Sequence, residues 1–291
     1  IPTIGVGNLA VGGTGKSPHI EYLAKILSPY IEVASLSRGY GRKTTGTLEV
    51  MGNSSSYHVG DEPLVLKMKF PNIGVFVGSN RAFAVPELVG KRPQTNVVLL
   101  DDVFQHRSVE VFENMLLTEY NLPFYQDFLL PVGALRELPT GAKRANTIIV
   151  TKCPPSISPD QEKDIIAKIK PNINQKVFFS TFDYGLPYRL FQPTSRIDLN
   201  KDMEVVLFSA IAGTDYLMEY LKNRVNMIHS IEFSDHHYFT ADEITQLHKT
   251  FSDLKANNKI ILTTEKDAVR LALLRDQIIA LQLPIFILPI E

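Results

Sequence analysis

Six consecutive residues near the start of the chain have the types and the spacing of a phosphate-binding loop. They are Gly12-Gly13-Thr14-Gly15-Lys16-Ser17, between an apolar run at residues 3–7 and a helical pattern at residues 16–27. In such loops glycines let backbone N–H groups surround phosphate oxygens, the lysine reaches the β- and γ-phosphates, and the hydroxyl binds Mg²⁺. The position that opens the usual motif holds Ala10, so the alternative is a glycine-rich turn with an incidental lysine. We favour the first interpretation and predict a nucleoside triphosphate site.

Two adjacent carboxylates, Asp101 and Asp102, follow an apolar run that ends at Leu100. Nucleotide-hydrolysing and kinase folds place a metal-binding aspartate at the end of such a strand. Neighbouring carboxylates repel unless a cation or hydrogen-bond donors offset the charge. A solvated turn is the alternative, and it is commoner for one aspartate than for a pair. We therefore expect Ser17, Asp101 and Asp102 to hold Mg²⁺, without a basis for choosing which aspartate binds directly.

Two other segments place polar side chains where an α/β sheet binds ligands. Arg38 and Tyr40 lie in Ser37-Arg38-Gly39-Tyr40-Gly41, directly after the second apolar run, and are candidates for substrate contacts. Asp61 precedes Glu62-Pro63, and proline suits the first turn of a helix. Asp61 is therefore either the cap of that helix or a catalytic base, and its local sequence does not separate the two.

Apolar, β-branched runs alternate with helical patterns along most of the chain. Strands are predicted at residues 3–7, 31–37, 73–78, 96–102, 115–118, 147–151, 177–181, 205–210, 227–233, 260–264 and 285–290. Helices are predicted at residues 16–27, 62–69, 81–88, 160–170, 215–223 and 241–254. The alternation predicts an α/β fold of the P-loop NTPase type, with a mostly parallel sheet and helices on both faces. A turn-rich stretch puts a soft boundary between a nucleotide-binding core, residues 1–153, and a second, smaller α/β lobe, residues 154–291.

The composition excludes several classes of protein. The chain has 30 Lys and Arg against 31 Asp and Glu, which argues against a nucleic-acid binder. Its single cysteine, Cys153, excludes a disulfide framework and a cysteine-based metal cluster and fits a reducing compartment. No apolar run has the roughly 18 residues of a transmembrane helix, and no secretion signal opens the chain. The chain begins at Ile1 within a predicted strand and without Met, which we interpret as a trimmed start.

Seven segments, in the same order and at fitting spacing, carry a resemblance to a known family. They lie at residues 7–18, 37–41, 60–63, 101–106, 135–137, 235–237 and 264–268. Together they resemble the tetraacyldisaccharide 4′-kinases, the lipid A 4′-kinases of Gram-negative bacteria, from residue 4 to about residue 270.

The resemblance implies a reaction, a substrate and a location. We expect ATP- and Mg²⁺-dependent phosphorylation of the 4′-hydroxyl of tetraacyldisaccharide 1-phosphate, which gives lipid IVA. We expect a monomer at the cytoplasmic face of the inner membrane, bound through an apolar N-terminal segment that this chain lacks. The alternatives are a P-loop kinase or NTPase for a soluble metabolite, and a nucleotide-gated assembly factor. A guanine-specific switch is disfavoured because Thr151-Lys152 lacks the following aspartate of that motif.

The resemblance also assigns catalytic roles. Asp61 matches the family's catalytic base, and His236, in Asp235-His236-His237, matches the histidine paired with it. Arg81 matches an arginine near the transferred phosphate, and Glu137 matches a residue near the nucleotide and metal.

Substrate contacts are less sharply assigned. Arg136 matches the same family segment as Glu137, and Gln105 and His106 are candidates for contacts with the disaccharide or the γ-phosphate. The role of His237 stays open, although we expect a structural one. Residues 264–267 end a predicted strand, and they form either part of the site or a helix cap with local pairing.

Overall fold

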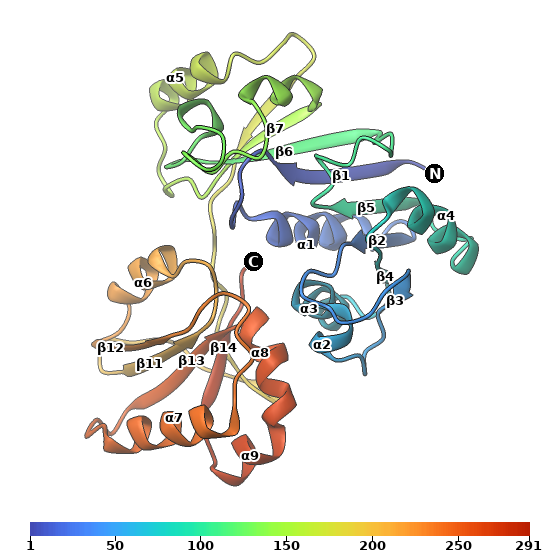
Figure 1. Cartoon of the computed structure of the whole chain (residues 1–291). Helices are drawn as coiled ribbons and strands as arrows, with labels where there is room; N and C mark the ends of the chain where they lie inside the picture. The colour runs from blue at the N-terminus through green and yellow to red at the C-terminus, as the bar shows by residue number, and fades with distance from the viewer. The chain divides into compact units, whose positions relative to one another are not determined.

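The chain, described over residues 1–291 by a computed structural model, divides into two units (Figure 1). The larger unit comprises Ile1–Ser54 and Glu62–Asp183, and the smaller one comprises Ser55–Asp61 and Tyr184–Glu291. This division differs from the boundary expected near residue 153. Strand β8 (Lys176–Phe179) pairs in parallel with β7 (Thr147–Thr151), so the residues after 153 complete the sheet of the larger unit. The short segment Ser55–Asp61 joins the smaller unit, which the sequence did not indicate.

The larger unit is built on an eight-stranded sheet with the order β3-β4-β2-β5-β1-β6-β7-β8. Its other strands are β1 (Thr3–Asn8), β2 (Val33–Ser37), β3 (Leu48–Glu49), β4 (Gly74–Val77), β5 (Val97–Asp101) and β6 (Glu113–Glu119). All neighbours pair in parallel except β3 with β4. Every residue of β2 and β5 is buried, as expected for parallel strands covered on both faces.

Helices cover this sheet. They are α1 (Lys16–Leu27), α3 (Asp61–Lys69), α4 (Arg81–Lys91) and α5 (Pro159–Ile169), with 3₁₀ turns η1 (Phe124–Gln126) and η2 (Pro139–Arg144). Helix α5 begins at a capping box, in which Ser158 and Gln161 satisfy each other's backbone N–H groups. The first residue of α3, Asp61, belongs to the smaller unit and the rest of the helix to the larger one.

The smaller unit has a six-stranded sheet with the order β10-β9-β14-β13-β11-β12. Its strands are β9 (Tyr188–Arg189), β10 (Gln192–Arg196), β11 (Glu204–Ser209), β12 (Met227–Glu232), β13 (Lys259–Thr264) and β14 (Ile285–Leu288). Its helices are α2 (Ser56–Val59), α6 (Asp215–Lys222), α7 (Ala241–Asp253), α8 (Glu265–Leu271) and α9 (Arg275–Ala280), with the turn η3 (Ala272–Leu274). The strands β12, β11, β13 and β14 are parallel, whereas β9 and β10 pair antiparallel at one edge.

Alternate residues of β11 face opposite sides of this sheet. Val206 belongs to the apolar cluster that contains Ile244 of α7, and Val205 belongs to the cluster that contains Leu217 of α6. Figure 1 accordingly shows α6 and α7 on opposite faces of the sheet.

The predicted α/β class is confirmed, and α1 and β7 have the predicted bounds. The structure contains six helices and strands that were not predicted, β3, α2, β9, β10, α8 and α9, and three 3₁₀ turns. β9 and β10 lie in a polar stretch, and all residues of β10 are exposed, so this edge strand carries no apolar signal. Helix α8 buries its residues from Asp267 to Leu271 and therefore lacks an amphipathic pattern. No helix in the structure is both long enough and apolar enough to cross a bilayer.

Candidate active site

The loop between β1 and α1 has the backbone of a phosphate-binding loop. Gly12 and Gly15 have φ angles of +105° and +90°, a region that favours glycine. Gly15 is the N-cap of α1, whose first-turn N–H groups and partial positive charge suit an anion. Val11 donates its N–H to the carbonyl of Ala134 at 2.7 Å, so the loop is tied to a neighbouring segment. The alanine at position 10 is therefore compatible with an ordered loop.

Asn8, to which the sequence analysis gave no role, organises this loop. Its buried side chain donates to Oγ1 of Thr14 at 2.9 Å and accepts from Nζ of Lys16 at 3.4 Å. Its backbone carbonyl accepts from Nε2 of Gln105 at 2.9 Å and from Nη2 of Arg136 at 3.0 Å. The sequence signal for this role was the position of Asn8, a polar residue that ends β1 directly before the loop.

Asp102 is held by two cations. Arg136 donates Nη2 to Oδ1 at 2.9 Å and Nη1 to Oδ2 at 3.2 Å, and Nζ of Lys16 lies 3.7 Å from Oδ1. Burial alone would raise the pKa of Asp102, but Arg136 and Lys16 outweigh it and lower the pKa. Asp102 also has a φ of 48°, in the left-handed region that non-glycine residues adopt rarely. Asp102 is thus a carboxylate kept ionised beside the P-loop lysine.

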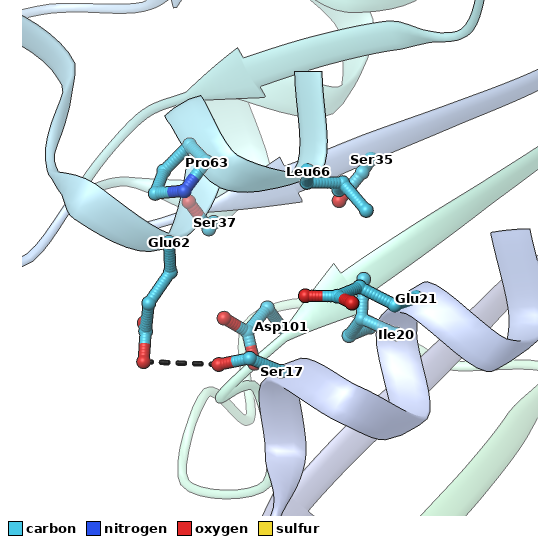
Figure 2. A pocket seen from close by; sticks show the side chains of 9 residues that line it. All are labelled: Ser17, Ile20, Glu21, Ser35, Ser37, Glu62, Pro63, Leu66 and Asp101. Carbon is cyan, nitrogen blue, oxygen red and sulfur yellow. Dashed lines mark hydrogen bonds between the residues drawn. The ribbon is translucent and has the colours of Figure 1, made fainter. Parts of the chain in front are cut away.

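Ser17 and Asp101 line a small cavity of about 10 Å³ with Glu62 (Figure 2). Oγ of Ser17 donates to Oε1 of Glu62 at 3.0 Å, and Figure 2 shows Asp101 directed towards the same serine. The structure contains no group of three His, Cys, Asp or Glu side chains suited to a metal ion. Mg²⁺ in nucleotide sites usually takes only one or two carboxylates and completes its shell with phosphate oxygens and water. The donor set of Ser17 and the paired aspartates therefore fits Mg²⁺.

Glu137 lies in a hydrogen-bonded cluster close to Asn8. Its Oε1 accepts from Nη2 of Arg144 at 2.8 Å and from Nε2 of Gln105 at 2.9 Å. Burial would raise the pKa of Glu137, but the hydrogen bonds from Arg144 and Gln105 outweigh it and lower the pKa. The structure thus brings Gln105, from the segment at residues 101–106, together with Arg136 and Glu137, from the segment at residues 135–137. Arg144 carried no sequence signal.

Arg81, the first residue of α4, is buried next to the last residue of β5. Its Nη2 donates to the carbonyl of Asp101 at 3.0 Å, and its Nη1 donates to the carbonyl of Gly78. Burial lowers the pKa of His106, and the positive charges of Arg81 and Arg38 lower it further, so these three side chains lie in one electrostatic environment. Arg38 is exposed, and so is Tyr40, between two glycines with positive φ.

Thr151 and Lys152, which come near a guanine-specific motif in sequence, have structural contacts. The hydroxyl of Thr151 donates to the carbonyl of Thr14 at 2.9 Å, and Lys152 pairs with Glu119 at 2.7 Å. Thr151 therefore supports the phosphate-binding loop from β7.

A second constellation lies in the smaller unit, at Asp61. Nδ1 of His236 lies 3.1 Å from Oδ2 of Asp61, and Nε2 of His236 lies 3.6 Å from Asp235. His236 has a φ of 60°, in the left-handed region that non-glycine residues adopt rarely. The hydrogen bond with Asp61 raises the pKa of His236, partial burial lowers it less, and the net pKa is raised. The predicted pair of Asp61 and His236 is thus present as a contact.

The neighbouring His237 faces elsewhere. Its Nε2 lies 3.0 Å from Glu243, and its ring stacks on Phe233 at a centroid distance of 4.8 Å. These contacts join the loop after β12 to α7, which is the structural role expected.

We expect His236 to stabilise the fold more at low pH than at high pH. Its pKa is raised above the ordinary 6.5, so the stabilisation is fully present below pH 6.5 and is lost as the pH rises through the raised value. Urea unfolding of the wild type and of His236→Gln at several pH values measures this difference in free energy of unfolding. His248→Gln, on α7, is the control for removing an imidazole from the same unit. A difference between wild type and His236→Gln that does not change with pH would contradict the ion pair.

Comparisons with known proteins agree with this chemistry. The model of the family described as tetraacyldisaccharide-1-P 4′-kinase matches residues 1–291. The chain is 40% identical to a tetraacyldisaccharide 4′-kinase of Bacteroides thetaiotaomicron, over 100% of this chain and 80% of that protein. It is 40% identical to one of Flavobacterium johnsoniae, over 93% and 78% of the two chains.

A solved structure shares the fold as well. It is LpxK from Aquifex aeolicus, described as an "apo" form in complex with ATP, with a TM-score of 0.70 and 28% identity over 100% of this chain and 83% of that one. The family model covers every residue, the two relatives carry the same description, and the solved LpxK shares the fold. This chain therefore belongs to the tetraacyldisaccharide 4′-kinase family.

Proposed function

We propose that this protein transfers the γ-phosphate of ATP to the 4′-hydroxyl of tetraacyldisaccharide 1-phosphate and so forms lipid IVA. The observation that carries the proposal is the phosphate-binding loop with Lys16 beside the ionised Asp102, in a chain that the kinase family's model matches throughout. A kinase for a soluble metabolite and an assembly factor are the alternatives, and family membership disfavours both.

In this proposal the larger unit holds the nucleotide. The backbone of residues 12–17 surrounds the phosphates, and Lys16 reaches the β- and γ-phosphate oxygens. Ser17, Asp101 and Asp102 hold Mg²⁺, which when bound neutralises charge on those oxygens. Arg81 and Glu137 are the other two catalytic residues of this unit. Arg81 donates to the carbonyl of Asp101, and Glu137 accepts from Gln105, which donates to the carbonyl of Asn8.

Asp61 accepts the proton of the attacking hydroxyl. Its Oδ2 is engaged by His236, whereas its buried Oδ1 has no hydrogen-bond partner within the protein. An acceptor oxygen without a partner is what a general base requires for an incoming hydroxyl.

Five side chains of the larger unit are candidates for the phosphorylated disaccharide. They are Arg38, Tyr40, Gln105, His106 and Arg136. Arg38 and Tyr40 are exposed on the loop after β2 and accessible to a sugar or a phosphate. Gln105 and Arg136 both donate to the carbonyl of Asn8, so they fix the edge of the site beside the phosphate-binding loop.

We further propose that the enzyme acts as a monomer at the cytoplasmic face of the inner membrane, where the acylated substrate and ATP meet. The exposed apolar side chains of Phe128, Leu130 and Val132 lie on the segment that is hydrogen-bonded to Val11 of the P-loop through Ala134. Exposed apolar clusters of this kind commonly mark lipid or protein contacts. Phe128→Ser/Val132→Ser should weaken sedimentation with phospholipid vesicles and leave ATP binding unchanged, and undiminished sedimentation would contradict this contact.

The test of the activity is direct. The purified protein is incubated with Mg²⁺, radiolabelled ATP and tetraacyldisaccharide 1-phosphate in detergent micelles, and the lipid is analysed by thin-layer chromatography and mass spectrometry. We expect a bis-phosphorylated lipid that carries the label. A folded, ATP-binding protein that forms no such product would contradict the kinase assignment.

A further inference from the structure

The segment at residues 264–267, whose role the sequence left open, ends in a buried carboxylate with a fixed position. Thr264 is the N-cap of α8, and its hydroxyl donates to Oδ2 of Asp267 at 2.7 Å. Oδ1 of Asp267 accepts from the backbone N–H of Ala210 at 3.1 Å. Asp267 is 0% exposed, so its orientation is set entirely by these neighbours.

Asp267 in turn holds Arg270, one turn further along α8. Nη2 of Arg270 donates to Oδ1 of Asp267 at 2.5 Å and to the carbonyl of Ala210 at 3.0 Å. The same carbonyl accepts from the backbone N–H of His236 at 3.2 Å. Ala210 therefore anchors both the arginine and the loop that carries the candidate catalytic histidine.

Arg270 also faces Asp61. Its Nε lies 3.7 Å from Oδ2 of Asp61, and the two side chains are 1% and 4% exposed. Nε and Nη1 of Arg270 make no hydrogen bond, so the contact with Asp61 is electrostatic and leaves the carboxylate able to accept a proton. A buried carboxylate stays ionised only when nearby cations or donors offset its desolvation.

We propose that Arg270, fixed by Asp267, is a positioning residue that keeps the carboxylate of Asp61 ionised and oriented for proton acceptance. The inference rests on the proposed function, in which Asp61 is the base. It explains why an ion pair is buried at this position, since the charge of Asp267 neutralises Arg270 and that of Arg270 supports Asp61.

The surroundings of Asp61 favour this assignment to Arg270. The charged and titratable groups around the pair of Asp61 and His236 are Asp235, Tyr238, Lys266, Asp267 and Arg270. Glu62, the next residue along α3, directs its carboxylate to Ser17 instead. His236 loses its positive charge as the pH rises, whereas an arginine stays charged throughout the working range. Arg270 is such a permanent cation, and its Nε lies at ion-pair distance from Asp61.

The test is Arg270→Gln, assayed as lipid phosphorylation across pH. We expect kcat to fall about 10- to 100-fold, because small displacements of a catalytic group have effects of this size. The KM for ATP should stay unchanged, since the P-loop belongs to the other unit. The acid limb of the kcat profile should move to higher pH, because loss of the cation favours the protonated carboxyl. Arg270→Lys, which keeps the charge, should restore the acid limb.

Two further variants separate positioning from folding. Lys259 is a cation of the same unit held by the carbonyls of Phe251 and Leu254, so Lys259→Gln is the matched control and should leave the pH profile in place. In the Asp61→Asn background, Arg270→Gln should cause no further loss of kcat, as expected for residues that act as one unit. If Arg270→Gln does not fold, Asp267→Asn/Arg270→Gln removes both buried charges together. We expect the same fall in kcat and the same shift of the acid limb for this double variant.

Failure of the role of Arg270 can be told apart from failure of the proposed function. A folded variant with the wild-type kcat and pH profile would overturn the role of Arg270 while leaving the kinase assignment intact. Losses that multiply in the Asp61→Asn background would also overturn it. Absence of activity in the wild type would instead count against the proposed function.

Discussion

Asp61→Asn is expected to lower kcat about 10²- to 10⁴-fold, the usual contribution of a general base. Asparagine keeps the size of the side chain but cannot take a proton, and it loses the charge that pairs with His236 at 3.1 Å and faces Arg270 at 3.7 Å. ATP binding should be nearly unchanged, because the phosphate-binding loop lies in the larger unit. Single-turnover phosphorylation together with a separate nucleotide-binding titration measures both quantities.

The matched control is Asp215→Asn. Asp215 is the first residue of α6, as Asp61 is of α3, and it is exposed in the same unit. We expect the control to keep the wild-type rate. If Asp61→Asn retains full turnover, Asp61 is not the base.

Lys16→Met is expected to lower kcat/KM for ATP about 10²- to 10³-fold, as for removal of one preorganised group that stabilises transition-state charge. Nζ of Lys16 lies 3.4 Å from Oδ1 of Asn8 and 3.7 Å from Asp102, so the charge is held at the mouth of the loop. Loss of the lysine removes positive charge from the β- and γ-phosphates and leaves Asp102 paired with Arg136. Nucleotide titration and steady-state kinetics together locate the defect in binding or in transfer.

Lys25→Met provides the comparison for this variant. Lys25 is an exposed lysine in the last turn of the same helix, and its replacement changes the net charge equally. Its kinetics should match the wild type. A wild-type rate in Lys16→Met would mean that the glycine-rich turn does not bind the phosphates.

The phosphate-binding loop was predictable because its determinants are local. Glycines at positions that need a positive φ, an apolar strand before them and a helix after them all lie within one short stretch of chain. The same holds for Asp101, the last residue of β5, and for Asp102 after it. The rest of that strand is apolar because parallel strands are buried on both faces. Elements without such a pattern, such as the exposed β10, were missed.

The contacts that join distant residues were not predictable from spacing or composition. His236 reaches Asp61 across 175 residues of chain, and only the family resemblance suggested their pairing. Nothing in the local sequence distinguishes Asp267 and Arg270 from an exposed helix pair, yet both are almost fully buried. The division into units also lay beyond the sequence, since it depends on which sheet β8 joins.

By itself the sequence determined the α/β class, the glycine-rich loop before α1 and the paired aspartates at the end of β5, because hydrophobic periodicity, glycine conformation and strand-end charge act between neighbouring residues. The tertiary structure alone decided that Asn8 organises the loop, that Glu137 is held by Arg144, and that Arg270 faces Asp61. Burial and charge pairing depend on which strand ends meet at the edge of a sheet. That meeting is a property of the whole fold and not of any single segment.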